Sequence, residues 1–215
     1  MTRAHYVVVL LLIGAALAAS LVAYPRLPDT IPTHWNIRGE ADGHGPKAPF
    51  LLLMPLVMAG IVLLFRFLGW LSPRQFDVDS FRSTYLYLMV LTVGLVGTLH
   101  GFMIHSAWSG RASPARFLVG SLFLFFALLG NVLGRVRRNF WIGVRTPWTL
   151  ASERVWIDTH RLSARLFVGS GLLGFVAVAA GLPLAGAFAL LMLTCLVPVL
   201  YSLVLYKRLE RRGEV

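Results

Sequence analysis

The chain has 215 residues, of which 57% are hydrophobic and only 13% are charged, and its mean hydropathy is +0.73. Soluble globular domains carry about 25% charged residues, so this composition excludes an ordinary soluble enzyme or binding domain. The formal net charge of +11 does not indicate nucleic-acid binding. In a membrane protein, basic residues set the orientation and attract anionic lipids of the inner leaflet, and those lipids are the partner that we expect.

Long apolar runs predict membrane-spanning helices, because about 20 apolar residues cross a hydrocarbon core of about 30 Å. The runs lack the alternation of a barrel strand. The first run also has features of a signal peptide, with Arg3 before it and the small residues ALAAS within it, but it is longer than the about 7–15 apolar residues of such peptides. We predict an all-α, polytopic membrane helix bundle with six transmembrane helices, at residues 5–24, 49–70, 83–105, 115–134, 163–181 and 184–206.

The distribution of basic residues predicts the orientation of this bundle. With the N-terminus in the cytoplasm, the cytoplasmic segments hold 15 of the 20 Lys and Arg residues, and the outer segments hold 5. We therefore expect both termini to be cytoplasmic, residues 25–48 to lie outside and residues 135–162 to lie inside. The chain reads as a single membrane domain over residues 1–215, with an N-terminal part to residue 110 and a second part from residue 111.

The connector between the first two spans, IPTHWNIRGEADGHGPK at residues 31–47, is unusually polar. Prolines 25, 28 and 32 prevent a helix there. Gly39, Gly43 and Gly45 accept positive φ at little cost. We therefore predict a shaped outer loop rather than a helix.

A cluster of histidines is expected near this loop, because the third span runs outward and carries two histidines toward its outer end. Imidazole and carboxylate groups are ligands of zinc and related metals, and such a site could activate water. The spacing matches no standard metal motif, so solvated loop histidines are the alternative, and no cofactor is then expected. The candidate ligands of a transition metal are His34, Asp42, His44, His100 and His105.

His100 differs from the other candidates because it lies within an apolar span, where an ionisable side chain is costly and suggests function. A hydrogen bond from His100 to a neighbouring helix is the alternative explanation, and we favour it.

The connector between the fourth and fifth spans is basic and rich in tryptophan. Pro147 disfavours helix just before it, and a helix is expected to start near Thr149. On that helix Ser152, Trp156 and His160 share one face. This pattern predicts an interfacial amphipathic helix with its arginines toward lipid headgroups and its tryptophans toward the acyl boundary.

In this order, the two connectors resemble the SdpI family of bacterial integral-membrane immunity proteins. The first looks like the outer-loop signature of the domain of unknown function that usually precedes the SdpI region. The stretch GN at residues 130–131, then Asn139, then GVRTPWTLASERVWIDTHR at residues 143–161 resembles the SdpI signature. The family pattern often has a proline and lysines between the two asparagines, where this chain has Gly134 and arginines.

The resemblance implies a multi-pass protein of the bacterial plasma membrane that protects the cell against a secreted antimicrobial peptide toxin. In the founding case the protein also sequesters a repressor at the inner face. Candidates for the toxin-facing surface are then His34, Asn36, Gly39, Asp42 and Gly43. The residues that we call the SdpI-like motif, expected at the inner face, are Asn131, Asn139, Arg145, Thr146, Pro147, Trp148, Glu153, Trp156, His160 and Arg161.

Two other classes of function stay open. The first is a metal-dependent hydrolase that faces outward and uses the histidine and aspartate cluster, although no HExxH, GxSxG or P-loop motif supports it. The second is a small transporter. The chain shows no convincing inverted repeat, and few ionisable residues lie at mid-membrane depth, where coupling sites usually sit.

Overall fold

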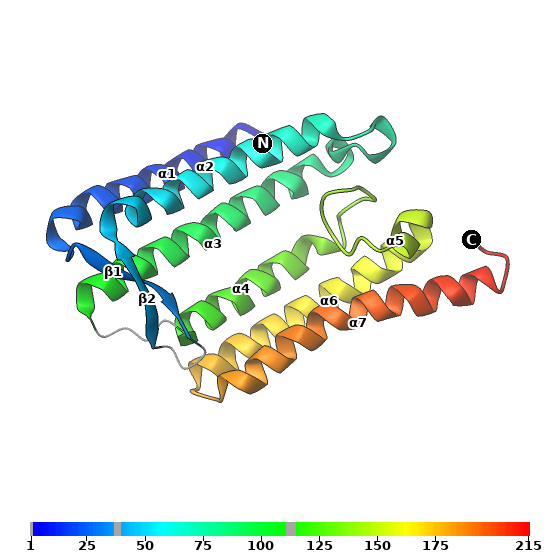
Figure 1. The fold of residues 1–215 in the computed structure, drawn as a ribbon. Helices are drawn as coiled ribbons and strands as arrows, with labels where there is room; N and C mark the ends of the chain where they lie inside the picture. Colours follow the sequence, from blue (N-terminus) through cyan, green and yellow to red (C-terminus); the bar gives the residue numbers. More distant parts are fainter. Residues whose placement is uncertain (1, 37–39, 111–114) are drawn as a thin grey trace. The chain divides into compact units, whose positions relative to one another are not determined.

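The fold is dominated by long apolar helices (Figure 1). The structure is a computed structural model that describes residues 2–36, 40–110 and 115–215. Six of its helices are long and apolar enough to cross a membrane, so the predicted six-span, all-α architecture is confirmed. These helices are α1 (Thr2–Ala23), α2 (Lys47–Leu71), α3 (Arg82–Ser109), α4 (Ala115–Leu133), α6 (Glu153–Ala179) and α7 (Leu184–Glu210).

The shorter elements lie between these helices. They are the 3-10 helices η1 (Tyr24–Arg26), η2 (Arg74–Phe76) and η3 (Val78–Phe81), the strands β1 (Thr30–Trp35) and β2 (Ala41–Pro46), and the helix α5 (Pro147–Ala151). β1 and β2 form an antiparallel hairpin whose register is irregular between Pro32 and Trp35. This hairpin was not predicted from the sequence, because prolines and glycines that indicate a loop are also tolerated in edge strands.

The chain divides into two compact units, each built from separate segments. The hairpin unit comprises Met1–Arg66 and Leu86–Ser121. The loop unit comprises Phe67–Tyr85 and Leu122–Val215. The helices α2, α3 and α4 therefore each contribute residues to both units.

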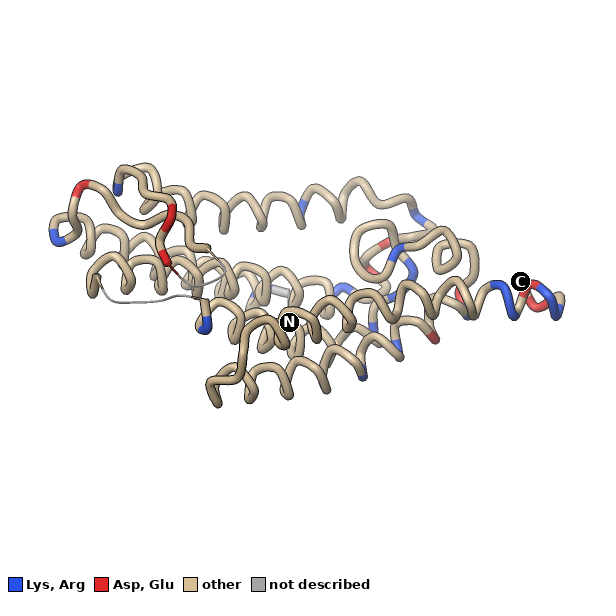
Figure 2. Tube along the Cα trace, turned by 60° about the horizontal axis from the view of Figure 1, so that its bottom comes forward, with Lys and Arg blue, Asp and Glu red and all other residues tan. Residues whose placement is uncertain are grey.

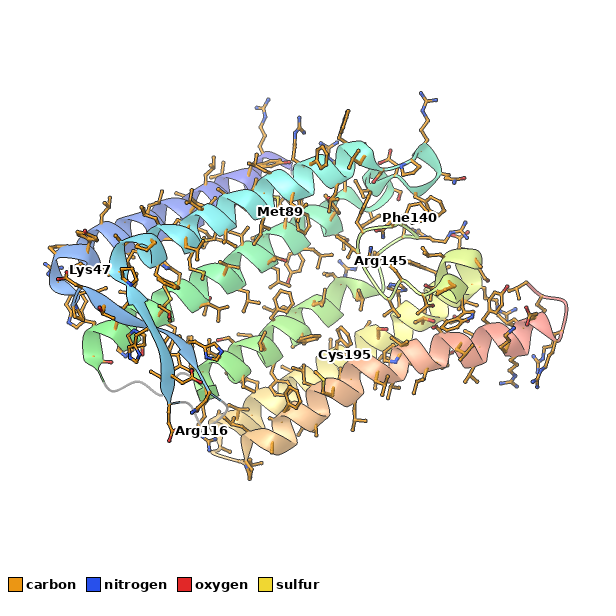
Figure 3. The ribbon with its side chains drawn as sticks, viewed as in Figure 1. Lys47, Met89, Arg116, Phe140, Arg145 and Cys195 are labelled. Carbon is orange, nitrogen blue, oxygen red and sulfur yellow. The ribbon has the colours of Figure 1, made fainter. Side chains whose placement is uncertain are left out.

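In the hairpin unit, an apolar cluster fastens the hairpin to the helix ends. Ile31 of β1 is fully buried in this cluster, which also contains Ala23, Leu27, Leu51, Ile104 and Ala107. Lys47, at the start of α2 (Figure 3), donates from Nζ to the carbonyl oxygen of Leu27 at 2.8 Å. The same ammonium lies 3.2 Å from Asp29 Oδ1. The hairpin is thus held at its base by apolar packing and by a half-buried cation.

A buried polar chain connects α1, α2 and α3 in the hairpin unit. Ser20 Oγ donates to the carbonyl oxygen of Leu51 at 2.7 Å and lies 2.8 Å from His100 Nε2. Because the single hydroxyl proton goes to Leu51, His100 Nε2 must donate to Ser20. The favoured explanation of this intramembrane histidine, a hydrogen bond to a neighbouring helix, is confirmed.

In the loop unit, glycines bring α4 and α6 into close contact. A Cβ added at Gly171 would lie 2.6 Å from the backbone nitrogen of Ala127, and one at Gly130 would lie 2.7 Å from Phe167 Cβ. Small residues permit such close approach between membrane helices. Residues 169–174, GSGLLG, have the spacing of a dinucleotide-binding fingerprint, but they lie inside a continuous helix instead of between a strand and a helix. α6 then packs side by side with α7 (Figure 1).

The expected interfacial helix takes a different form from the prediction. α6 is continuous from Glu153 to Ala179, so the amphipathic residues and the fifth span belong to one helix. A separate short helix, α5, precedes it and begins at Pro147, two residues before the predicted start. The break falls at Ser152, which has an extended backbone with φ −130° and ψ 125° and caps α6. No proline or glycine interrupts the helix between this cap and the apolar run.

We predict that Gly171→Ala lowers the free energy of unfolding by about 1–3 kcal/mol, because its methyl group would overlap the backbone of α4. Gly169→Ala is the matched control on the same helix, because a Cβ there meets open space. Alanine favours a helix interior, so this control is expected to stabilise by about 0.5–1 kcal/mol. Thermal unfolding of both variants in detergent measures the difference, and equal effects would contradict the inferred close contact.

Candidate functional site

The loop between α4 and α5, residues 134–146, is organised by the side chain of Asn139. Its Oδ1 accepts from the backbone nitrogens of Trp141 at 2.7 Å and Ile142 at 2.8 Å. Its Nδ2 donates to the carbonyl oxygens of Arg137 at 2.8 Å and Ile142 at 3.1 Å. The side chain is 0% exposed, and these four bonds use the whole bonding capacity of its amide. Asn139 therefore replaces the regular backbone bonding that this loop lacks.

His160 connects the same loop to α6. Its Nε2 accepts from the backbone nitrogen of Val144 at 3.1 Å, and its Nδ1 lies 2.8 Å from the carbonyl oxygen of Trp156. Because a backbone N–H can only donate, the ring proton of the neutral imidazole is on Nδ1. Gly143 makes this contact possible: its φ is +115°, and a Cβ there would lie 2.2 Å from Nε2.

Trp156 lies one turn before His160 on α6 and is also buried by the loop. Its indole Nε1 donates to the carbonyl oxygen of Val136 at 2.8 Å. Its ring stacks on the imidazole of His160 with a centroid distance of 4.0 Å and an interplanar angle of 20°. The predicted shared face of Ser152, Trp156 and His160 exists and is buried. Its predicted contact with the acyl boundary is wrong for Trp156, because buried Trp N–H groups need a partner and the loop supplies one.

Two threonines tie α5 to the loop and to α7. Thr146 caps α5: its Oγ1 accepts from the backbone nitrogen of Thr149, and its own backbone nitrogen donates to Thr149 Oγ1 at 2.9 Å. Pro147 occupies the first turn, where its missing N–H costs nothing. Thr146 Oγ1 also lies 3.1 Å from Ser202 Oγ on α7. Local capping and one tertiary contact thus explain Thr146, Pro147 and Thr149 of the motif.

The loop also contacts the segment that follows α2. Trp141 Nε1 donates to Ser72 Oγ at 2.7 Å, and the rings of Phe76 and Phe140 pack edge to face with centroids 4.3 Å apart. Arg138 lies over the Phe76 ring and donates to the carbonyl oxygen of Leu150 at 3.2 Å. These contacts join three separate segments of the loop unit.

The remaining members of the SdpI-like motif are more accessible. Asn131, Arg145, Pro147, Glu153 and Arg161 are exposed, and Trp148 is half-buried. Arg145 donates to the carbonyl oxygen of Phe140 in the same loop (Figure 3). The motif therefore combines buried residues that build the loop with charged residues that remain available for contacts.

A cavity of about 640 Å³, which we call the basic cavity, opens beside the loop. Its walls come from η3 and the start of α3, the loop after α4 and the first turns of α6. Figure 2 shows basic residues collecting where this loop meets α6, and again at the end of α7. The charged residues that line the basic cavity are Arg82, Arg135, Arg137, Arg138 and Arg161 together with Asp79 and Glu153.

The predicted toxin-facing residues lie in the hairpin. His34 Nδ1 is 2.6 Å from Asp42 Oδ1, with side chains 73% and 44% exposed. Asn36 Nδ2 donates to Glu40 Oε2 at 2.8 Å near the hairpin turn. Gly43 packs under His34, since a Cβ there would lie 2.8 Å from His34 Cβ. The candidate Gly39 lies outside the described residues.

The five candidate metal ligands are not gathered into one group. Across residues 2–36, 40–110 and 115–215, no three His, Cys, Asp or Glu side chains lie close enough together to hold a metal ion. His34 and Asp42 pair with each other, while His100 is engaged by Ser20. His105 contacts the ring of Phe102, and His44 lies opposite Pro32 in the hairpin. Metal binding at the outer face stays a prediction.

Several features that hold the loop together were not predicted from the sequence: the roles of Gly143, Trp141, Ser72 and Ser202, and the role of Thr149 as the capping partner of Thr146, since Thr149 was expected only to begin the helix. Two of them carried a readable signal. A glycine in a proline-containing turn suggests positive φ, and the pattern T-x-x-T before a helix suggests reciprocal capping. The Ser72 and Ser202 contacts had no local signal, because their partners are 69 and 56 residues away in the chain.

We predict that Asn139→Ala destabilises the protein by about 3 kcal/mol or more, since it leaves several buried backbone groups without partners. Asn131→Ala is the matched control, because Asn131 belongs to the same motif and is exposed. It should change stability by no more than about 0.5 kcal/mol. Comparable losses in thermal unfolding would show that Asn139 does not hold the loop.

We predict that Gly143→Ala destabilises by at least about 2 kcal/mol more than Gly181→Ala. Both glycines have positive φ, +115° and +85°, so both substitutions strain the backbone. Only the methyl group at residue 143 would also displace the imidazole of His160, since a Cβ at residue 181 meets open space. Chemical denaturation in detergent measures both variants, and equal losses would mean that the imidazole contact contributes little.

Comparisons with known proteins match two separate regions of the chain. Residues 11–59 match a domain of unknown function, DUF1648, and residues 135–202 match the SdpI/YfhL protein family. The Immunity protein SdpI of Bacillus subtilis (strain 168) is 25% identical over 168 residues, which are 78% of this chain and 78% of that protein. No solved structure matches the chain significantly. The chain therefore carries a DUF1648 region followed by an SdpI/YfhL family region, and the resemblance to the SdpI family is confirmed.

Proposed function

We propose that this chain is a membrane immunity protein that protects its cell against a secreted antimicrobial peptide toxin. The observation that carries the proposal is the match to an immunity protein over 78% of both chains. Six helices able to cross a membrane agree with protection at the membrane itself.

The proposed location is the bacterial plasma membrane, with both termini in the cytoplasm. This orientation places 15 of the 20 basic residues on the cytoplasmic side, as the positive-inside rule favours. If each of the six candidate helices crosses once, the β1–β2 hairpin faces outward. The loop at residues 134–146 then faces inward.

The hairpin is the proposed toxin-binding surface. Its base is anchored by the buried Ile31, whereas His34 and Asp42 are exposed as a bonded pair. In a two-stranded sheet both strands are edges, and an edge can accept an extended peptide through backbone hydrogen bonds. An anchored ribbon with a polar exposed side suits recognition of a peptide, because little order has to be created on binding.

The SdpI-like motif is the proposed inner platform, which sequesters a repressor protein. Its buried members hold the loop, and Arg145, Glu153 and Arg161 offer exposed charges for a partner. For a signal to pass inward, the toxin must bind one arrangement of the helices more tightly than another. The Thr146–Ser202 contact joins the platform to α7 and so gives it a connection to a spanning helix.

The test is expression of this chain in a Bacillus subtilis strain that lacks its immunity protein SdpI, followed by challenge with the toxin against which that protein acts. We expect survival to rise, and we expect the double substitution His34→Ala and Asp42→Ala to remove most of the gain. The double substitution Arg211→Ala and Arg212→Ala, at exposed residues outside the hairpin and the SdpI-like motif, is the matched control and should retain protection. Restoration of the relative itself is the positive control.

The proposal fails if the relative restores survival while this chain, present in the membrane at equal amount, gives none. Protection that survives the hairpin double substitution would instead move the toxin-binding surface away from the hairpin.

A further inference from the structure

The basic cavity lies where three candidate spans begin or end. Its lining residues come from residues 79–84 in η3 and at the start of α3, residues 134–138 after α4 and residues 153–161 at the start of α6. The polar headgroups of a bilayer lie at the ends of its spanning helices. A ligand in this cavity can therefore be reached from the headgroup layer or from the adjoining water.

The charge of the cavity favours an anion. Five arginines line it against two carboxylates, and one of these carboxylates, Asp79, already pairs with Arg82 at 3.2 Å. Within the described part of the chain, Arg135, Arg137 and Arg161 form no ion pair with a carboxylate. A concave site lined by one sign of charge focuses the field and concentrates the opposite ion.

The donors of the cavity suit a phosphate group. The planar guanidinium group presents paired N–H donors that match phosphate oxygens, and such bonds are stronger than those between neutral groups. The hydroxyl groups of Ser83 and Thr84 add neutral donors along one wall, whereas Ser80 Oγ donates to the carbonyl oxygen of Asp77 at 3.0 Å. The imidazole of His160 adds none at Nε2, which accepts from Val144.

The frame of the cavity is rigid. Trp156 and His160 on one wall are buried, stacked and bonded to the loop, and Asn139 fixes the loop that carries three of the arginines. Preorganised walls reduce the ordering that binding requires. The buried residues of the SdpI-like motif thus position the arginines of the loop, and the motif itself supplies one further arginine, Arg161, to the lining.

We propose that the basic cavity is a binding site for a phosphate group, carried either by the headgroup of an anionic phospholipid or by a small soluble phosphate ester. The site shares Glu153 and Arg161 with the proposed inner platform, but phosphate binding requires neither a toxin nor a repressor, so the inference does not depend on the proposed function.

The experiment is native mass spectrometry of the full chain in detergent, titrated separately with dioleoylphosphatidylglycerol and with glycerol 3-phosphate. The cavity variant is Arg135→Gln with Arg161→Gln. The matched control is Arg208→Gln with Arg211→Gln, which removes the same charge from the exposed end of α7. We expect the Kd to rise at least about tenfold in the cavity variant and less than about twofold in the control.

The two probes identify the source of the phosphate. Binding of phosphatidylglycerol alone assigns the site to a lipid headgroup, and binding of both probes shows that the phosphate group suffices. Equal weakening in the cavity and control variants would overturn the proposal, because it would show only general attraction to positive charge. So would undetectable binding of both probes to the wild-type chain, or equally tight binding of succinate.

A second variant keeps the test decisive if the double arginine variant does not fold. Glu153→Gln removes a negative charge from the lining and leaves all five arginines in place. We expect it to tighten binding of the effective probe by about threefold or more. Unchanged or weaker binding in this variant would contradict the proposed site.

Discussion

The buried amide of Asn139 is the interaction on which the loop unit depends. Residues 134–146 contain no helix or strand, yet Val136, Asn139 and Thr146 within them are buried. An unpaired buried backbone group is costly, so a loop in this position needs side-chain partners. The side chain of Asn139 bonds to two backbone N–H groups and two carbonyl oxygens of the loop. It thereby places Gly143 and Val144 against His160.

The same requirement explains the other polar residues in the apolar parts of the chain. In hydrocarbon, each polar group must find a partner inside the protein. Ser20 Oγ and His100 Nε2 meet this requirement as a pair between α1 and α3, whereas His100 Nδ1 is buried without a hydrogen-bond partner among the described residues. Hydroxyl groups on the spans meet it by bonding to their own helix, as Thr92 and Ser170 do through carbonyl oxygens four residues earlier. Polar side chains in the spanning helices therefore serve hydrogen bonding within or between helices, and they are not by themselves evidence of a catalytic site.

The two regions matched by family models differ in the exposure of their characteristic residues. The DUF1648 region contains the hairpin, whose exposed side carries polar pairs. The SdpI/YfhL region hides most of its characteristic residues and uses them to build a frame for arginines. The hairpin is the surface that we propose for a peptide toxin, and the frame carries arginines of the proposed phosphate site.

Six spans, their approximate limits and the special character of the two connectors followed from sequence, because apolar length and charge distribution are local properties. The hairpin did not, since its prolines and glycines suit loops and edge strands alike. Sequence also placed Trp156 and His160 on one face, but it could not tell lipid from protein as their neighbour. Only the tertiary structure decided that, because the loop that covers them returns from α4 and its bonds join residues 16 to 20 positions apart.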